Sequence, residues 1–158
     1  MAAELLRRFP EIHLTATDLD PVMVEALERR LAPFGVRAIV RRADATELPF
    51  PSDSFDTALS FLMLHHVGRW EQALLELVRV LRPGGTLLGC DLLAYPASDL
   101  VQRAVGRGDE RLIPWRELAS SLSALSLEGV WLRRGLGGLV ARFRGVKTSA
   151  AEASARAA

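Results

Sequence analysis

Residues 13–23 read HLTATDLDPVM, and this stretch decides how the chain folds. The apolar and β-branched positions before Asp18 are typical of a short strand, which we expect over residues 12–17. Asp20 suits a helix N-cap, and Pro21 suits the first helical position, where an N–H would have no partner within the helix. The stretch therefore predicts a strand, two carboxylates at its end, and a helix that begins at once.

Outward from this stretch, the same alternation of strand and helix continues. We expect helices over residues 4–9, 21–32, 70–81 and most of 98–127, strands over 36–40, 57–61 and 86–93, and a closing hairpin of 129–134 and 139–147 across GLGG. Alternating strands and helices imply right-handed crossovers and a mainly parallel sheet. The predicted fold class is therefore α/β and Rossmann-like, with helices on both faces and a C-terminal antiparallel hairpin.

The pattern makes specific predictions for one helix, one strand and one turn. The helix after Pro21 presents Val22, Ala26, Leu27 and Leu31 on one stripe, and Gly35 is a suitable stop signal. Residues 57–61 are apolar enough for a strand that is buried on both faces. Arg-Pro-Gly-Gly at 82–85 predicts the end of the preceding helix and a tight turn.

Polar groups follow the ends of several predicted strands. They are Asp18, Asp44, the segment from Ser60, and Asp91. Sheets of this kind bind ligands at the carboxyl ends of their strands. The pattern therefore predicts that these groups lie on one rim of the sheet.

Composition excludes several classes of protein. The chain has 158 residues, 49% of them hydrophobic, and a net charge of +1, so neither nucleic acid nor an anionic membrane is an expected partner. Cys90 is the single cysteine and lies in an apolar run, which excludes a disulfide framework or a thiolate metal site. There is no apolar run of membrane-spanning length and no signal peptide. We expect a soluble cytoplasmic protein.

Four stretches, in order and at ordinary spacing, carry a family resemblance. They are ATDLDPVMVEAL, RRADATELPFPSDSFDTALS, FLMLHHV with ALLELVRVLRPGGTLL, and GVWLRRGLGGLVARFRGVK. Together they resemble the class I S-adenosylmethionine-dependent methyltransferases that act on small molecules, of the type 11-like kind. The resemblance runs from about residue 4 to 147. We therefore expect a methyltransferase-like domain over 1–147 and a disordered tail over 148–158.

The resemblance implies a set of residues that bind S-adenosyl-L-methionine: Asp18, Leu19, Asp44, Ala45, Ser60 and Phe61. Asp18 matches the acidic residue that accepts hydrogen bonds from the ribose hydroxyls, and Leu19 the residue that packs on adenine. Asp44 matches the acceptor for the adenine amino group, and Ala45 a backbone donor to the ring. Ser60 and Phe61 match the turn beside the methionine part and the transferable methyl.

Purely structural roles remain possible for Asp18 and Asp44. Asp18 could be a strand-end carboxylate in solvent. Asp44 could instead cap a short turn within ADATEL. For Asp20 the structural role is favoured over ligand binding, since an Asp-Pro pair at a helix start is explained by capping alone.

The family's first strand and its glycine-rich loop have no counterpart in this sequence. No glycine occurs before Gly35, and GLGG at 135–138 follows the wrong strand to replace that loop. We expect that Met1 is an internal methionine of a longer, N-terminally truncated enzyme. The second explanation is a natural truncation whose sheet closes differently or which borrows a strand from a partner. The alternative function is a cofactor-free degenerate fold that acts as an interaction module.

His65 and His66 are the candidates for a catalytic role. Adjacent side chains cannot both face one metal from a helix or strand, and no third ligand has suitable spacing, so no metal site is predicted. One histidine buried at the rim and the other exposed is the simple expectation. As a hypothesis, one of them could take a proton from a hydroxyl or amine acceptor.

Two other enzyme classes share the aspartate pattern. Asp-x-Asp-x-Val fits the haloacid dehalogenase-like phosphatases, but these need a later lysine and then an acidic pair for magnesium, and Lys147 is the only lysine. A nicotinamide dehydrogenase would need the same absent glycine loop. The sequence therefore favours methyl transfer to a small-molecule acceptor, whose identity and reacting atom it does not specify.

Overall fold

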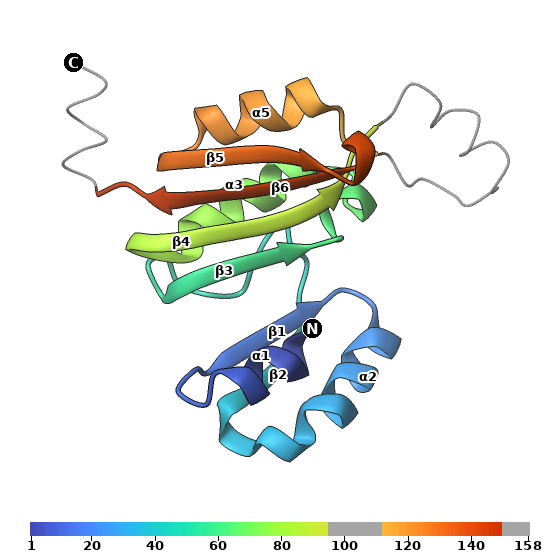
Figure 1. Cartoon of the computed structure of the whole chain (residues 1–158). Helices are drawn as coiled ribbons and strands as arrows, with labels where there is room; N and C mark the ends of the chain where they lie inside the picture. The colour runs from blue at the N-terminus through green and yellow to red at the C-terminus, as the bar shows by residue number, and fades with distance from the viewer. Residues whose placement is uncertain (95–111, 150–158) are drawn as a thin grey trace, which may run out of the picture. The chain divides into compact units, whose positions relative to one another are not determined.

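The computed structural model describes residues 1–94 and 112–149, and within the chain two compact units are distinguished, Met1–Pro49 and Phe50–Ala158. Figure 1 shows the elements of each unit, which are described separately below. The first part of the helical region expected over 98–127 lies outside the described residues, as does the expected tail from residue 150 onward.

Unit 1 is a small α/β layer. Its elements are α1 (Ala2–Arg8), β1 (Leu14–Asp18), α2 (Pro21–Leu31), the 3-10 helix η1 (Ala32–Arg37) and β2 (Ala38–Arg42). The two strands pair in parallel, from Leu14 with Ala38 to Asp18 with Arg42. The helices bury Ala3, Leu6 and Leu31, against which partly buried residues of both strands pack. The parallel pair confirms the crossover predicted from the alternation.

The start of α2 is as expected, and its end at Leu31 lies within one residue of the expected end at Ala32. Asp20 caps the helix, because its Oδ1 accepts a hydrogen bond from the Val22 N–H at 2.8 Å. Gly35 has φ +54, a non-helical conformation that kinks η1, and β2 begins at Ala38, two residues after the expected strand start at Val36. Val22 is exposed, so the predicted apolar stripe is wrong there, whereas Leu31 is buried.

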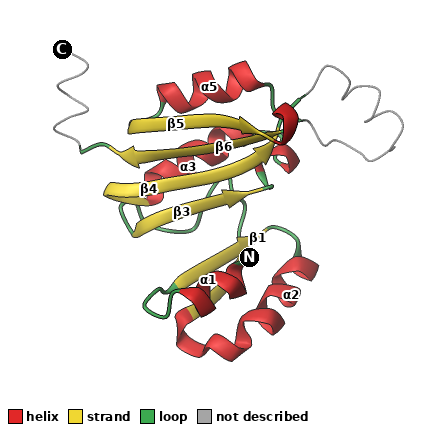
Figure 2. Cartoon of the chain, viewed as in Figure 1, coloured by secondary structure: helices red, strands yellow, loops and turns green. Residues whose placement is uncertain are grey.

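Unit 2 is built on a four-stranded sheet. Its elements are β3 (Phe55–Phe61), η2 (Leu64–His66), α3 (Trp70–Val80), β4 (Leu81–Leu92), α5 (Trp115–Ala124), β5 (Leu127–Gly135), η3 (Leu136–Gly138) and β6 (Val140–Lys147). The strand order is β3-β4-β6-β5, with β3 parallel to β4 and the other two pairs antiparallel (Figures 1 and 2). The closing hairpin was predicted correctly, and its outer strand lies at the sheet edge.

The two faces of this sheet differ. Helix α3 lies behind the strands in Figure 1, and buries Ala73, Leu74 and Val78. On β3 the burial alternates, with Ala58 and Ser60 buried but Leu59 and Phe61 36% and 39% exposed. The prediction that this strand is buried on both faces was therefore wrong, because within the described residues only one of its faces is covered. The open face holds a hollow of about 850 Å³.

The junction between α3 and β4 also differs from expectation. Leu81, which the helical spacing assigned to the helix, is the first residue of β4 and pairs with Phe55. The register then moves to Thr57 with Thr86, so residues 82–85 form an irregularity within the strand, with Gly84 at φ +79. Both assignments bury Leu81, which is why spacing alone does not distinguish them.

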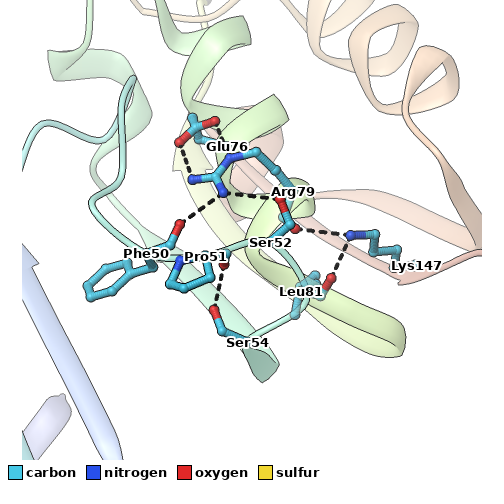
Figure 3. A network of polar contacts seen from close by, with 8 residues as sticks. All are labelled: Phe50, Pro51, Ser52, Ser54, Glu76, Arg79, Leu81 and Lys147. Atoms are coloured by element: carbon cyan, nitrogen blue, oxygen red, sulfur yellow. Dashed lines mark hydrogen bonds and ion pairs between the residues drawn. The ribbon is translucent and has the colours of Figure 1, made fainter.

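A polar network fixes the amino end of this sheet (Figure 3). Lys147 Nζ donates to Asp53 Oδ1 at 2.8 Å and to the carbonyl oxygens of Arg79 and Leu81 at 3.0 and 2.6 Å. Arg79 donates to both carboxylate oxygens of Glu76 at 2.6 and 2.8 Å and to the Phe50 carbonyl at 2.9 Å. The hydrogen bonds to Glu76 raise the pKa of Arg79. The network therefore joins the last strand, α3 and the loop before β3.

Ordered structure continues past Lys147. Thr148, which was expected to begin the tail, is buried, and both its N–H and its hydroxyl donate to the Ser126 carbonyl at 3.0 and 3.3 Å. Within the described residues, no helix has the length and apolar character needed to cross a membrane.

Candidate functional site

Asp18 closes β1 in unit 1, and one of its carboxylate oxygens is in use. Its Oδ1 accepts from the Asp20 N–H at 3.0 Å, and its carbonyl accepts from the Ala43 N–H at 3.0 Å. Among the described residues, none bonds to Oδ2 of this half-buried carboxylate. Leu19 follows with a side chain that is 56% exposed. The strand end therefore offers a carboxylate oxygen and an apolar side chain together.

Asp44 and Ala45 follow β2 in the same unit. Asp44 Oδ1 accepts from both the N–H and the hydroxyl of Thr46 at 2.8 Å, and so organises its own turn. This is the capping arrangement that the sequence left open as an alternative. Ala45 is half-buried within the turn.

Ser60 and Phe61 end β3 in unit 2 and point to opposite faces of the sheet. Ser60 is 1% exposed, and its Oγ has no hydrogen-bond partner among the residues that the structure describes. A buried hydroxyl without a partner is unusual, because burial removes its bonds to water. Phe61 lies on the open face.

The turn that follows β3 is held in an uncommon conformation. Leu62 has φ +50, in the left-handed region that residues with a Cβ rarely occupy, and its N–H donates to the Cys90 carbonyl at 2.8 Å. Asp91 Oδ2 accepts from the next two backbone N–H groups, those of Met63 and Leu64, at 3.1 and 2.8 Å. Contacts from β4 therefore determine the shape of this turn.

The structure separates the two histidines. His65 is buried and its Nδ1 lies 2.6 Å from Asp91 Oδ1, whereas His66 is exposed. The expectation of one buried and one exposed ring is confirmed. No group of three potential metal ligands occurs within the described part of the chain.

Asp91 is the residue whose role the sequence did not reveal. Its side chain is fully buried, although aspartate is seldom buried without partners. That signal was present in the sequence, since Asp91 stands within the apolar run TLLGCDLL. Its partner at position 65 is 26 residues away, and no local pattern connects the two.

The residues present have the chemistry that S-adenosylmethionine requires. Among the described residues, Asp18 keeps an oxygen that could accept from a ribose hydroxyl, Leu19 exposes an apolar surface that suits a purine, and the buried Ser60 hydroxyl has no partner. The first two belong to unit 1 and the third to unit 2. Each half therefore fits the part of the cofactor that the resemblance assigns to it.

Comparison with known proteins gives a consistent result. Residues 1–89 match the family model described as Methyltransferase domain. A demethylmenaquinone methyltransferase of Clavibacter sepedonicus is 33% identical over 170 residues, which cover 92% of this chain and 69% of that protein. A 27-O-demethylrifamycin SV methyltransferase of Amycolatopsis mediterranei is 32% identical over 127 residues, which cover 75% of this chain and 46% of that protein.

Solved structures agree on the fold. A SAM-dependent methyltransferase from Thermotoga maritima, described as a possible histamine N-methyltransferase, superposes with a TM-score of 0.67 at 21% identity, covering 84% of this chain and 72% of that one. The likeness confirms the Rossmann-like α/β fold, and at this identity it carries the fold alone. With the family match and the relatives, it establishes that the chain belongs to the methyltransferase-domain family of class I S-adenosylmethionine-dependent methyltransferases.

Proposed function

We propose that this chain transfers a methyl group from S-adenosylmethionine to a small-molecule acceptor, with the cofactor held by the residues that the sequence indicated. The observation that carries the proposal is that two neighbouring carboxylates, Asp18 and Asp20, have different hydrogen-bonding roles. Asp20 uses Oδ1 to cap α2, whereas Asp18, at the carboxyl end of a parallel strand, keeps Oδ2 without a partner among the described residues.

Each proposed cofactor residue has a distinct task. Asp18 accepts hydrogen bonds from the ribose hydroxyls and Leu19 packs on the adenine. Asp44 and Ala45 contact the edge of the adenine, while Ser60 and Phe61 line the methionine part. When bound, S-adenosylmethionine supplies a methyl group on a positively charged sulfur, which a nucleophile can displace. The chain's contribution is chiefly to hold the two reactants close and aligned.

The acceptor is proposed to be a small molecule and not a nucleic acid. The relatives described above are named for a demethylmenaquinone and for a demethylrifamycin, both small molecules. The net charge of +1 gives no broad electrostatic attraction for a polyanion. The single cysteine is in keeping with a cytoplasmic location.

Calorimetric titration of S-adenosylhomocysteine into the 158-residue chain tests the proposal, with Asp18→Ala and Asp20→Ala as a matched pair. We expect micromolar binding by the unmodified chain and a loss of at least about tenfold with Asp18→Ala, about 1.4 kcal/mol. Asp20→Ala should lower the melting temperature through loss of the cap, and leave affinity within about threefold. Equal effects of the two substitutions on affinity would contradict the proposal.

A second candidate is an interaction module without a cofactor, the alternative function stated in the sequence analysis. That candidate predicts a folded chain, with a cooperative thermal transition, that does not bind S-adenosylhomocysteine. Circular dichroism melting, recorded on the titrated sample, distinguishes this outcome from loss of binding through unfolding.

A further inference from the structure

Asp18 and Arg42 stand on the same face of the sheet at the carboxyl ends of β1 and β2. The two residues are the last register partners of this parallel pair, and partners in register share a face. They form no ion pair, and Arg42 Nε donates instead to the Leu19 carbonyl at 2.9 Å. Among the described residues, the guanidinium thus leaves Oδ2 of Asp18 without a partner.

The Leu19–Asp20 peptide group lies in the short turn that joins β1 to α2 (Figure 1). It is held from both sides, because its C=O accepts from Arg42 Nε and its N–H donates to Asp18 Oδ1 at 3.0 Å. The C=O and N–H of a trans peptide are coplanar and point in opposite directions. The two bonds together therefore determine the orientation of this peptide plane, and with it the place where the N–H meets the Asp18 carboxylate.

The Arg42 contact lies at the surface. The side chain is exposed, and the main chain beside it is already joined to β1 by the bond from the Ala43 N–H to the Asp18 carbonyl at 3.0 Å. A hydrogen bond in this setting contributes little to overall stability, because water replaces it when it opens. Loss of the contact should therefore change the orientation of the turn more than the stability of the fold.

We propose that Arg42 is a positioning residue for the cofactor, which acts through the Leu19–Asp20 peptide to orient the Asp18 carboxylate toward the ribose hydroxyls. This proposal rests on the proposed function above and deepens it. Arg42 acts without contact to the ligand, and the site does not depend on its positive charge. The requirement is one N–H group at the position of Nε.

Three substitutions at Arg42 separate the donor from the charge. Arg42→Gln places an N–H at the same distance along the side chain as Nε and removes the charge. Arg42→Lys keeps the charge but has a methylene at that position, and Arg42→Met has similar length with neither donor nor charge. Arg30→Met is the matched control for charge, since Arg30 is exposed in the last turn of α2, at the opposite end of that helix from Asp20.

Calorimetric titration of S-adenosylhomocysteine and of 5′-methylthioadenosine into each variant measures the effect. The two probes share the ribose and the adenine, and only the first has the amino-acid part. We expect Arg42→Met and Arg42→Lys to weaken both probes by the same factor, about three- to tenfold, which is the contribution of one hydrogen bond. Arg42→Gln and Arg30→Met should stay within about twofold of the unmodified chain, with all melting temperatures within about 3 °C.

A double variant tests whether Arg42 acts through Asp18. In the Asp18→Ala background the peptide N–H has lost its acceptor, so the further change Arg42→Met should weaken binding by less than about twofold. A cost as large as in the unmodified background would show that Arg42 acts independently of the carboxylate, and would overturn the proposed route.

Amide exchange in the chain without ligand separates positioning from general loosening of unit 1. In Arg42→Met the Asp20 N–H should exchange about three- to tenfold faster, and in Arg42→Gln at an unchanged rate. The Val22 N–H, whose acceptor is the Asp20 side chain, should keep its rate in both variants. Faster exchange at Val22, together with a lower melting temperature, would show a structural role only.

The remaining outcomes also decide the matter. Unchanged affinity of Arg42→Met for both probes would overturn the inference and leave the proposed function intact. Binding that Arg42→Lys keeps and Arg42→Gln loses would show that the charge is required and not the N–H group. Failure of the unmodified chain to bind S-adenosylhomocysteine would remove the proposed function and this inference together.

Discussion

Phe143 on β6 lies directly over Gly89 on β4, and the two are register partners in the antiparallel pair. The phenyl ring is almost fully buried and occupies the space that a Cβ at position 89 would need. The glycine is therefore required by packing and not by its backbone conformation, since its φ is not positive. The absence of a side chain at position 89 leaves the space that the buried Phe143 ring occupies.

Gly89→Ala should be strongly destabilising. The added methyl overlaps ring atoms of the buried Phe143, and overpacking of this kind in a closely packed core costs about 1–3 kcal/mol or more. Chemical denaturation measures the loss. Gly68→Ala is the control, because no atom of the described residues lies within 4 Å of a Cβ placed there, and its stability should stay within about 0.5 kcal/mol of the unmodified chain. Recovery of stability in Gly89→Ala with Phe143→Leu would confirm the clash as the cause.

Lys147→Met should destabilise unit 2 by about 1–3 kcal/mol. The substitution removes three hydrogen bonds from a largely buried ammonium group, two of them to carbonyls at the end of α3 and the start of β4. Asp53→Asn is the control. Asp53 is half-exposed at φ +59, a conformation that asparagine tolerates, so loss of its charge should cost less than about 0.5 kcal/mol. An equal cost for both would show that the ion pair, and not the carbonyl contacts, stabilises the strand end.

Arg79→Met should destabilise the protein by an amount that does not change with pH between about 6 and 10. The folded-state pKa of Arg79 is raised above its ordinary value by its hydrogen bonds to Glu76. A group with a raised folded pKa stabilises fully below its unfolded pKa and loses that contribution only as pH rises through the folded value. Both values lie far above this range, so the stabilisation is constant within it.

Melting curves of Arg79→Met and of the unmodified chain between about pH 6 and 10 measure the difference in stability. Arg82→Met provides the comparison, since its ion pair with Asp56 is largely exposed and should contribute less than about 0.5 kcal/mol. A difference between Arg79→Met and the unmodified chain that changed by more than about 1 kcal/mol with pH would contradict this account of Arg79.

Local chemistry allowed several elements to be predicted from the sequence. The cap at Asp20 and the hairpin across residues 135–138 depend on neighbours within a few positions, and the structure confirms both. The position of Asp18 at the end of a strand was also predicted from the local sequence, and the structure confirms it. The family resemblance supplied its proposed ligand, which composition and spacing alone do not identify.

The misassigned features depend on distant parts of the chain. Leu59 and Phe61 have the apolarity of a doubly buried strand, yet what covers a face is decided by helices elsewhere. Leu81 satisfies the spacing of α3 and the pairing of β4 equally well, so a contact with Phe55 decides between them. The role of Asp91 became visible only when the sheet brought it to the turn at His65.

The turn at Leu62 offers a test of whether its conformation is imposed by the surroundings. Leu62 is half-exposed at φ +50, where a leucine costs about 1–2 kcal/mol relative to the right-handed region. Leu62→Asn preserves the shape of the side chain and tolerates this φ, so stability should be maintained or increased by up to about 1 kcal/mol.

Leu62→Ile, of equal volume but branched at Cβ, should lose about 1–2 kcal/mol, because branching makes the left-handed region harder to occupy. Urea denaturation of the two variants measures the contrast. If both variants lost the same stability, the side chain's contacts and not its backbone angle would be the determining feature. If the expected order holds, the backbone angle of Leu62 is imposed by the hydrogen bonds that the Cys90 carbonyl and the Asp91 carboxylate accept from the N–H groups of this turn.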